Sequence, residues 1–412
     1  MKNKILISLL LLSSIILASG GSIYSRYGIG NLLVSNSARD AGTGFSGLAY
    51  AQHDHISLLN PAGWHKIDMT RFSTGVSFTG YDIADMTQST FYSETDFSGF
   101  LIAFPISNDY GITFVGGLTP YSNINYDVLS DVDDPILGKH TFEYSGDGGL
   151  SKAFLGFSYK LPFNLALGGT FDYYSDKSEY KSSVKFEQNT DFANTEYVFG
   201  LKSRGLGFSF GLISPDLSQV LNIDGLSQLR LGATYQFGMT LKVDSVGAYN
   251  NSNGYEDYLS KGFDREIPHR LGLGLAFNWS ENYTFMVDFV NQPFSQFKEN
   301  KIKSEYLRDF YRYSIGFEYR HASSRYGSTW QQVIWRGGLS YEQTQFIFNG
   351  KGIDEMAAYA GVSFPMGFDN SIDIGLKYGI RGTTDFNLLK ENIFAAFITI
   401  NFGDLWFIRP ER

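Results

Sequence analysis

The sequence predicts an all-β fold, a transmembrane antiparallel β-barrel, and three observations favour this class. Charged residues make up 18% of the 412 residues and aromatic residues 17%, with 45 glycines, whereas soluble domains carry about 25% charged residues. Mean hydropathy is −0.15, and beyond the N-terminus no stretch approaches the ~20 apolar residues of a membrane helix. Many segments also alternate apolar with small or polar residues at a period of two, which is typical of strands.

The N-terminus has the charge and hydropathy order of a secretory signal peptide. Lys2 and Lys4 precede an apolar run from Ile5 to Leu17, and the small residues Ala18, Ser19 and Gly20 follow. This run is too short to cross the ~30 Å core of a bilayer as a helix. We therefore expect residues 1–20 to be a signal peptide, cleaved at or close to Gly20, so that the mature chain works beyond the inner membrane.

From Arg71 onward the alternation defines about 14 strands. Residues 271–279, 311–319 and 372–378 show it most clearly, with large apolar side chains at every second position. The expected strands lie near residues 71–82, 96–107, 111–121, 149–160, 164–176, 197–212, 229–243, 268–279, 282–293, 310–321, 333–345, 355–366, 371–381 and 392–403.

The connections between these strands follow the pattern of outer-membrane barrels, with short turns at one end and long loops at the other. Residues 108–110, 161–164, 280–281 and 367–370 are short turns, whereas residues 120–140 and 244–267 form long polar connections. The turns near 214–228 and 322–332 are longer than this pattern prefers. The sequence thus divides into a signal peptide (1–20), an N-terminal segment (21–68) and a barrel (69–412).

The N-terminal segment differs from the barrel in composition. Residues 24–63 are rich in Gly, Ser and Asn and alternate weakly, which leaves a disordered tail as one interpretation. Their apolar side chains, among them Leu32, Phe45 and Leu58, favour a packed structure instead. A segment of this kind before the first strand most simply folds into the lumen as a hatch, or plug.

Two motifs resemble enzyme signatures in their letters alone. Gly42–Gly47 matches a dinucleotide-binding fingerprint, but it lacks the preceding strand and following helix that this chemistry requires. Gly207–Gly211 matches a nucleophile elbow, but its Phe and Gly/Ser residues alternate as in a barrel strand, with no evident His and acid partners. We expect neither a catalytic nor a cofactor-binding site, and therefore no enzyme.

Metal and nucleic-acid sites are likewise not expected. The chain has no Cys, and His53 and His55 alone do not complete a metal site. Asp131, Asp133 and Asp134 lack the spacing of a calcium loop and are interpreted as a solvated acidic connection. A net charge of −9 provides no field that attracts nucleic acid.

The triplet Asn60-Pro61-Ala62 is singled out by its position between the N-terminal segment and the first strand. Pro61 holds Asn60 extended, and the Asn60 amide can donate and accept hydrogen bonds inside a lumen. We expect these three residues to anchor the hatch.

The chain resembles the FadL-type family of outer-membrane transporters for long-chain fatty acids and other hydrophobic compounds. The resemblance lies in residues 39–42 through 49–51, in Asn60-Pro61-Ala62, and in the strand starts at 229–235, 267–274 and 288–297. It implies a fourteen-stranded barrel with an N-terminal hatch. The last strand is followed by residues 404–412, where members of the family commonly stop at a terminal aromatic residue.

The resemblance also implies passive uptake of a hydrophobic small molecule and its exit sideways into outer-membrane lipid. In the family this exit lies beside a kink in the third strand, where this chain carries Gly116 and Gly117. Glycines inside a strand permit such a kink, although the two could instead fill a crowded lumen. Met286, Ile393 and Phe397 in the expected inward-facing set favour an apolar ligand, since burial contributes roughly 25 cal/mol per Å².

The expected product is therefore a monomeric outer-membrane protein without cofactor. The alternative is a structural or secretion-associated barrel that binds protein partners.

Overall fold

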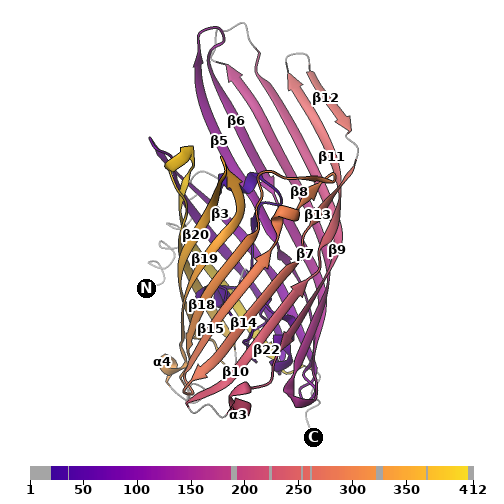
Figure 1. Ribbon diagram of the computed structural model, residues 1–412, viewed down its shortest axis with the longest axis vertical. Coiled ribbons are helices and arrows are strands. Elements are labelled where there is room, and N and C mark those ends of the chain that lie inside the picture. The colour runs from indigo at the N-terminus through magenta and orange to yellow at the C-terminus, as the bar shows by residue number, and fades with distance from the viewer. Residues whose placement is uncertain are drawn as a thin grey trace, which may run out of the picture.

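Fourteen wall strands close into one antiparallel barrel in the computed structural model of the chain (Figure 1). The structure describes residues 20–35, 37–186, 193–221, 225–251, 254–259, 262–321, 328–367 and 370–406. The expected signal peptide lies outside the described residues, apart from Gly20. No helix in the described ranges is both long and apolar enough to cross a membrane.

Ten of the wall strands are single elements and four are built from consecutive shorter ones. The single strands are β2 (Thr70–Ala84), β3 (Ser89–Ser107), β8 (Ala166–Phe186), β9 (Thr195–Ile213), β15 (Tyr283–Gln292), β18 (Phe310–Tyr319), β19 (Ile334–Phe348), β20 (Lys351–Pro365), β21 (Ser371–Gly382) and β22 (Lys390–Asp404). The composite ones are β4 (Ile112–Pro120) with β5 (Ser122–Asp134), β6 (Gly138–Gly148) with β7 (Leu150–Lys160), β10 (Leu226–Gln236) with β11 (Met239–Asn251), and β12 (Gly254–Leu259) with β13 (Phe263–Ile267) and β14 (Arg270–Trp279).

The barrel is closed by pairing between its first and last strands. β2 runs antiparallel to β22 in an unbroken register from Thr70 opposite Asp404 to Ala84 opposite Lys390. A closed wall leaves no long free edge, so its backbone groups are satisfied within the sheet. The predicted fold class and strand number are confirmed.

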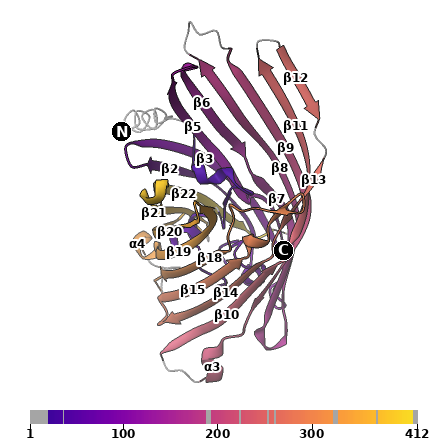
Figure 2. The same ribbon diagram turned by 45° about the horizontal axis from the view of Figure 1, so that its top comes forward.

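The two long polar connections expected near 120–140 and 244–267 are wrong, because both are largely β-structure. β5 pairs with β6, and β11 pairs with β12, so each connection forms a hairpin. With the upper parts of β8 and β9, these strands raise one side of the wall above the other, as Figures 1 and 2 show. We call this raised part, formed by residues 122–148, 176–186, 193–204, 239–251 and 254–259, the extension.

The described residues of the N-terminal segment, 20–35 and 37–69, pack against the inner face of the wall. It contains η1 (Ile23–Arg26), β1 (Asn31–Leu32), α2 (Ala38–Gly42) and η2 (Pro61–Lys66). α2 contacts β19 to β22, whereas η2 contacts β4, β7, β8 and β9 on another part of the wall. Ala41, Ala49 and Ala62 are completely buried. The segment therefore packs against widely separated strands from the lumen side.

Short elements complete the connections. They are the helices α3 (Leu217–Leu221) and α4 (Thr329–Gln332), the 3-10 turns η3 (Pro162–Asn164), η4 (Phe294–Gln296) and η6 (Asp385–Asn387), and the two-residue strands β16 (Lys298–Glu299) and β17 (Ile302–Lys303). α3 and α4 lie at the end opposite the extension (Figure 1). We call that end the turn end.

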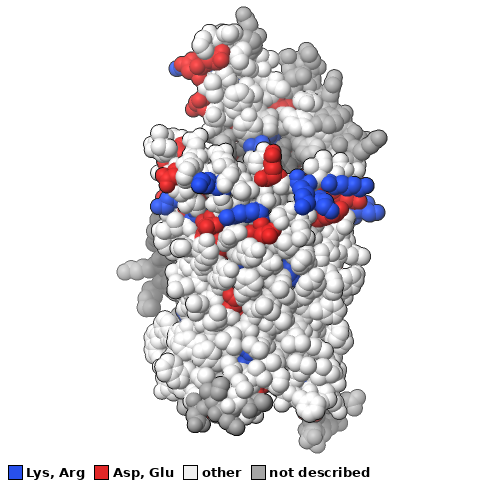
Figure 3. Space-filling view, viewed as in Figure 1, with Lys and Arg blue, Asp and Glu red and all other residues white. Residues whose placement is uncertain are grey.

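The two faces of the wall follow the alternation in the sequence. In β9, Phe208 and Phe210 are exposed on the outer face, while Gly207 and Gly211 are buried toward the lumen. In Figure 3, acidic and basic side chains gather in a band across the face and on the extension, and the surface between this band and the turn end is almost uncharged. This is the outer surface that a lipid-embedded barrel requires.

Candidate functional site

The Asn60 amide joins the N-terminal segment to the barrel wall. Its Nδ2 donates to the carbonyl oxygens of Leu48 at 2.6 Å and Leu212 at 3.1 Å, and its Oδ1 accepts from the backbone N–H of Ala62 at 3.0 Å. Leu212 belongs to β9 of the wall. Asn60 is also the N-cap of η2, with Pro61 in the first turn, where its missing N–H costs nothing.

Glycines in the wall make room for this triplet. A methyl group at Gly168 would lie 2.3 Å from the carbonyl carbon of Pro61, and one at Gly211 would lie 2.0 Å from Oδ1 of Asn60. Both distances are far shorter than a van der Waals contact. The triplet is thus seated directly on the backbones of β8 and β9.

Ion pairs hold the opposite side of the segment. Arg39 Nη1 lies 2.9 Å from Asp54 Oδ1 within the segment, and Arg39 Nε lies 3.2 Å from Asp373 Oδ2 on β21. Arg320, just after β18, approaches Asp54 Oδ2 at 3.2 Å. Glu318 joins the same group through Arg320. We call Arg39, Asp54, Glu318, Arg320 and Asp373 the Arg39 network.

The protonation of two segment residues is set by this packing. Burial alone would raise the pKa of Asp54, but the guanidinium groups of Arg320 and Arg39 hold the pKa of this carboxyl well below its usual range. Burial lowers the pKa of His65 to about 4. At neutral pH, Asp54 is therefore ionised and His65 is neutral.

The lumen carries more charge than the sequence-based set of inward residues suggested. Met286, Ile393 and Phe397 are buried, as expected. However, the inward positions of β18 to β22 also hold buried ionic side chains. Arg336 forms an ion pair with Glu318, and Arg381 forms one with Glu355. The missed charges alternate with outward apolar residues, so a strand-by-strand reading of inward positions could have found them.

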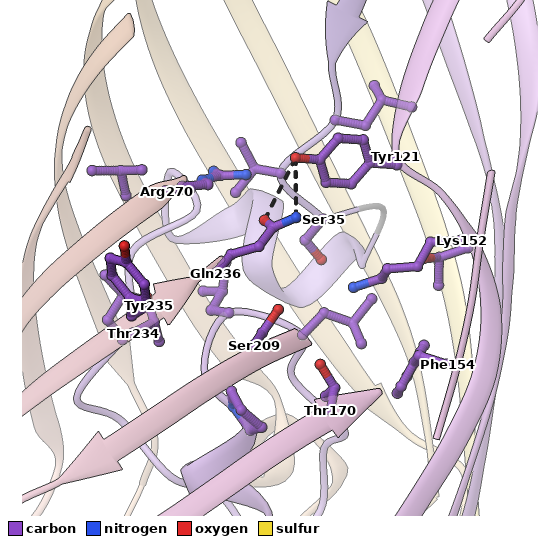
Figure 4. A pocket seen from close by; sticks show the side chains of 18 of the residues that line it. Ser35, Tyr121, Lys152, Phe154, Thr170, Ser209, Thr234, Tyr235, Gln236 and Arg270 are labelled. Atoms are coloured by element: carbon purple, nitrogen blue, oxygen red, sulfur yellow. Dashed lines mark hydrogen bonds between the residues drawn. The ribbon is translucent and has the colours of Figure 1, made fainter. Parts of the chain in front are cut away.

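A cavity of about 110 Å³ remains between the N-terminal segment and the wall (Figure 4). Apolar side chains from both sides line it, namely Leu33, Val34, Leu48, Leu58, Leu59 and Trp64 of the segment and Phe154 and Val290 of the wall. An apolar cavity of about 150 Å³ is known to hold benzene. This cavity can therefore hold a small apolar group or one end of a longer molecule.

Cationic side chains reach the same cavity. Figure 4 shows Lys152 of β7 and Arg270 of β14 among the residues that line it, near Tyr121 and Gln236. Lys152 Nζ lies 5.1 Å from the ring centroid of Phe154. Within the described ranges, neither Lys152 nor Arg270 makes a hydrogen bond or an ion pair with a protein group. Two cations beside apolar walls form a site suited to an anion with an apolar tail.

A third cation at the cavity is only partly satisfied. Arg312 Nη2 donates to the carbonyl oxygen of Phe45 at 3.1 Å, but Nε and Nη1 have no hydrogen-bond acceptor among the described residues. Its Nη1 lies 4.0 Å from Glu342, at the limit of an ion pair. The net electrostatic character of the cavity is therefore positive.

The wall beside the cavity contains a break in its hydrogen-bond ladder. β4 pairs with β3 only up to Leu118 opposite Phe100. Beyond Tyr121 the chain continues as β5, which pairs with β6 and with β1, and the described residues show no backbone pairing between β5 and residues 89–99 of β3. We call this break the ladder gap. At its edge, β3 bulges at Gly99, whose φ is +92°.

Gly116 and Gly117 lie in β4 just before the ladder gap. Gly116 pairs with Ile102 and Leu155, and Gly117 with Leu101 and Phe154, without a register shift on either side. The interruption of the strand falls at Tyr121 instead. Whether solute leaves beside these glycines stays a prediction.

The structure shows where the motifs that were rejected from the sequence lie. Gly42 and Gly44 pack closely on β19 and β20, and Gly207 to Gly211 lie in β9. His55 Nε2 lies 3.1 Å from Asp40 Oδ1. Asp131 and Asp133 belong to β5, on the extension. Across the part of the chain that the structure describes, no group of three or more metal-ligating side chains is found.

The comparisons with known proteins agree with this architecture. A sequence model of a family described as BamG matches residues 1–411. None of the curated proteins is significantly similar to the chain in sequence.

Among solved structures, the chain is similar to CymD, a monoaromatic hydrocarbon channel, at 15% identity over 91% of this chain and 99% of that one, with a TM-score of 0.61. The toluene transporter TodX of Pseudomonas putida matches at 18% identity, 90% and 98% coverage and a TM-score of 0.61. A FadL homologue of Pseudomonas aeruginosa matches at 11% identity, 90% and 98% coverage and a TM-score of 0.59. The TM-scores and coverages show that the chain shares the fold of these channels.

Proposed function

Since the chain belongs to the BamG family and has the fold of hydrocarbon channels, we propose that it is an outer-membrane channel for passive uptake of hydrophobic compounds. Among these we favour amphipathic acids such as long-chain fatty acids. The observation that carries the proposal is the cavity in which Lys152 and Arg270, with no hydrogen bond or ion pair to any described residue, lie beside apolar walls.

The chemistry of this cavity distinguishes an acid from a neutral hydrocarbon. A carboxylate placed between Lys152 and Arg270 would accept charge-assisted hydrogen bonds, which are roughly twice as strong as neutral ones. Its first methylene groups would contact Trp64 and Phe154. Toluene would fill the apolar part but leave both cations without a partner, at a cost in desolvation.

The N-terminal segment supplies the gate in this proposal. Residues 21–68 act as a hatch, with Asn60, Pro61 and Ala62 as its anchor on the wall. Because the remaining cavity is small, an acyl chain can pass only when the segment shifts. The ladder gap beyond Gly116 and Gly117 is the proposed lateral exit into outer-membrane lipid.

The surface and the N-terminal sequence support the proposed location in the outer membrane. The almost uncharged belt on the face in Figure 3 fits a bilayer, and residues 1–20 have the pattern of an export signal. The wall closes within a single chain, which supports a monomer.

A charge-removal experiment tests the proposal. Proteoliposomes containing the wild type or a Lys152→Met, Arg270→Met double variant would be supplied with labelled palmitate or labelled toluene. Palmitate uptake should fall at least about tenfold, because hydrogen bonds to charged groups contribute roughly 1.5–3 kcal/mol, while toluene uptake should not fall. Lys202→Met, which removes an exposed cation from the outer face of β9, is the matched control. Wild-type liposomes that take up neither compound faster than empty ones would exclude the proposal.

A second candidate, a barrel that binds a protein partner, is favoured by the extension. The strand register places Phe142 and Tyr144 of β6 and Phe199 of β9 on its inner face. Aromatic side chains of this kind are typical of binding surfaces. Purification from native membranes would show a companion protein in equal amount, which Phe142→Ser with Phe199→Ser should release; a barrel that always purifies alone would exclude this candidate.

A further inference from the structure

The first described residues lie at the ladder gap. A methyl group at Gly20 would lie 2.6 Å from the ring of Tyr92 on β3. One at Gly21 would lie 2.9 Å from the carbonyl oxygen of Asn125 on β5 and 2.9 Å from Glu94 Oε2 on β3. Residues 20 and 21 therefore pass between the two strands that no backbone pairing joins, directly beside the carboxyl group of Glu94.

Glu94 is surrounded by hydrogen-bond donors but has no cation. Its Oε1 accepts from the Tyr81 hydroxyl at 2.8 Å, and its Oε2 accepts from the side-chain amides of Asn123 at 3.0 Å and Asn125 at 2.9 Å. No ion pair between described residues involves Glu94. The Glu94 carboxyl is thus held among donors with no cation to balance it, so a positive charge at Gly21 would stabilise its ionised form.

Neighbouring contacts hold residue 21 in this position. Ser22 Oγ donates to Glu391 Oε1 at 2.7 Å, on β22. Ser25 Oγ donates to the carbonyl oxygen of Asn125 at 3.2 Å and accepts from the Asn125 N–H at 3.1 Å. The segment is thus fastened to two different strands within five residues of Gly20, and Gly21 has little freedom to leave Glu94.

We propose that Glu94 is the binding site for the N-terminal ammonium group of the mature chain, which forms at Gly21 when the signal peptide is removed. Before cleavage the nitrogen of Gly21 is a neutral amide; after cleavage it carries a positive charge and three donors beside the carboxylate. Charge-assisted hydrogen bonds of this kind are short and strong. Processing of the chain would therefore place an ion pair between the N-terminus and β3 at the edge of the ladder gap.

This inference rests on the expected cleavage near Gly20 and does not depend on which compound is transported. The test therefore measures the pKa of the α-amino group and not the uptake of a compound. The mature protein would be purified from outer membranes, its N-terminus identified by mass spectrometry, and its α-amino group titrated through the pH dependence of reductive methylation. A free α-amino group has a pKa of roughly 7.7–8.0.

In the wild type, the pKa of the α-amino group should lie at least about one unit above that range, which makes methylation at pH 7.5 about tenfold slower. Glu94→Gln should restore the ordinary rate, and Glu94→Asp should retain part of the protection. Asp96→Asn removes an equal charge two residues along β3 and should leave the rate unchanged.

An N-terminus outside residues 20–22, an ordinary pKa in the wild type, or equal effects of the Glu94 and Asp96 variants would each overturn the inference. If Glu94→Gln does not assemble, the wild-type titration alone decides.

Discussion

At the scale of single residues, Asn60 joins three backbones with one side chain. Replacement by Ala leaves the carbonyl oxygens of Leu48 and Leu212 and the N–H of Ala62 without their partner. Buried groups left unsatisfied cost about 1–3 kcal/mol. We expect Asn60→Ala to loosen the N-terminal segment, which should raise single-channel conductance and the rate of its proteolysis.

The control for this variant is Asn108→Ala, since Asn108 lies exposed in the turn between β3 and β4. It should behave as the wild type. Unchanged conductance and unchanged protease resistance in Asn60→Ala would show that the triplet does not anchor the segment.

Two adjacent glycines of β8 provide a matched pair. A methyl group at Gly168 would meet the Pro61 backbone at 2.3 Å, whereas one at Gly169 would come no closer than 3.4 Å to its nearest neighbour, the Phe210 ring. Gly168→Ala should therefore displace the segment and increase its proteolysis several-fold, while Gly169→Ala should not. Equal protease resistance of both variants would mean that Asn60-Pro61-Ala62 does not pack tightly on the wall.

His65 makes the segment sensitive to acid. Burial lowers the pKa of His65 to about 4, and the positive charges of Lys66, Arg230 and Lys160 act in the same direction, while the hydrogen bond to the Ala62 carbonyl opposes it. A folded-state pKa below the ordinary value of about 6.5 means that the unfolded segment binds more protons. The contribution of His65 to the stability of the packed segment is therefore fully present above about pH 6.5. It falls by about 3 kcal/mol as the pH drops toward 4.

We expect conductance of the reconstituted barrel to rise between pH 6.5 and pH 4. His65→Gln should remove most of this rise, because glutamine keeps a donor for the Ala62 carbonyl but cannot titrate. A rise of the same size in His65→Gln would assign the effect to another group. The Asp54 carboxyl, whose pKa is held low by Arg320 and Arg39, should contribute only at more acidic pH.

At the scale of elements, the alternation predicted the wall strands well and the extension poorly. Residues 268–279 were expected as a strand, and β14 spans Arg270–Trp279. In contrast, Asp131 and Asp133 suggested a solvated connection, whereas they lie in β5. Acidic residues on a strand that stands clear of the uncharged belt look like a loop when only the sequence is read.

Only those contacts of the candidate site that join residues close in sequence could be predicted. The hydrogen bond between Asn60 and the Ala62 N–H is local and could be expected from the letters Asn60-Pro61-Ala62, whereas the bond from Asn60 to Leu212 on β9 could not. Lys152 and Arg270 come together only because β7 and β14 lie around the same lumen, and no short motif encodes that proximity.

The pairing of β1 with β5 offers a reversible test of the lateral exit. Leu32 lies opposite Ser122, and Cα atoms of antiparallel partners are about 4.5–5.5 Å apart, within the range of a disulfide. The chain has no Cys of its own. Oxidised Leu32→Cys, Ser122→Cys should block palmitate uptake, and a reducing agent should restore it.

Ser314→Cys with Ser340→Cys joins β18 to β19, away from the ladder gap, and is the control. Blockage by this control as well, or uptake through the oxidised β1–β5 variant, would contradict exit at the gap.

At the scale of the whole molecule, the strand pairing of the wall depends little on the N-terminal segment. β2 to β22 pair with one another, and the N-terminal segment adds only the two residues of β1 to the sheet. A mature chain that lacks residues 21–66 should therefore still insert, remain β-rich by circular dichroism and shift its gel mobility on heating. Its conductance should exceed that of the full chain; loss of assembly would show that the segment is needed to build the wall.

The pairing of β2 with β22 also constrains the order of events during assembly. The first and last strands can pair only after the last strand has reached the barrel. This pairing closes the wall around the lumen. Ala38 and Ser22 bond to Thr399 and Glu391 of the last strand, so these contacts of the segment can form only once this strand is in place. We therefore expect the segment to reach its final position together with the closing of the barrel and not before it.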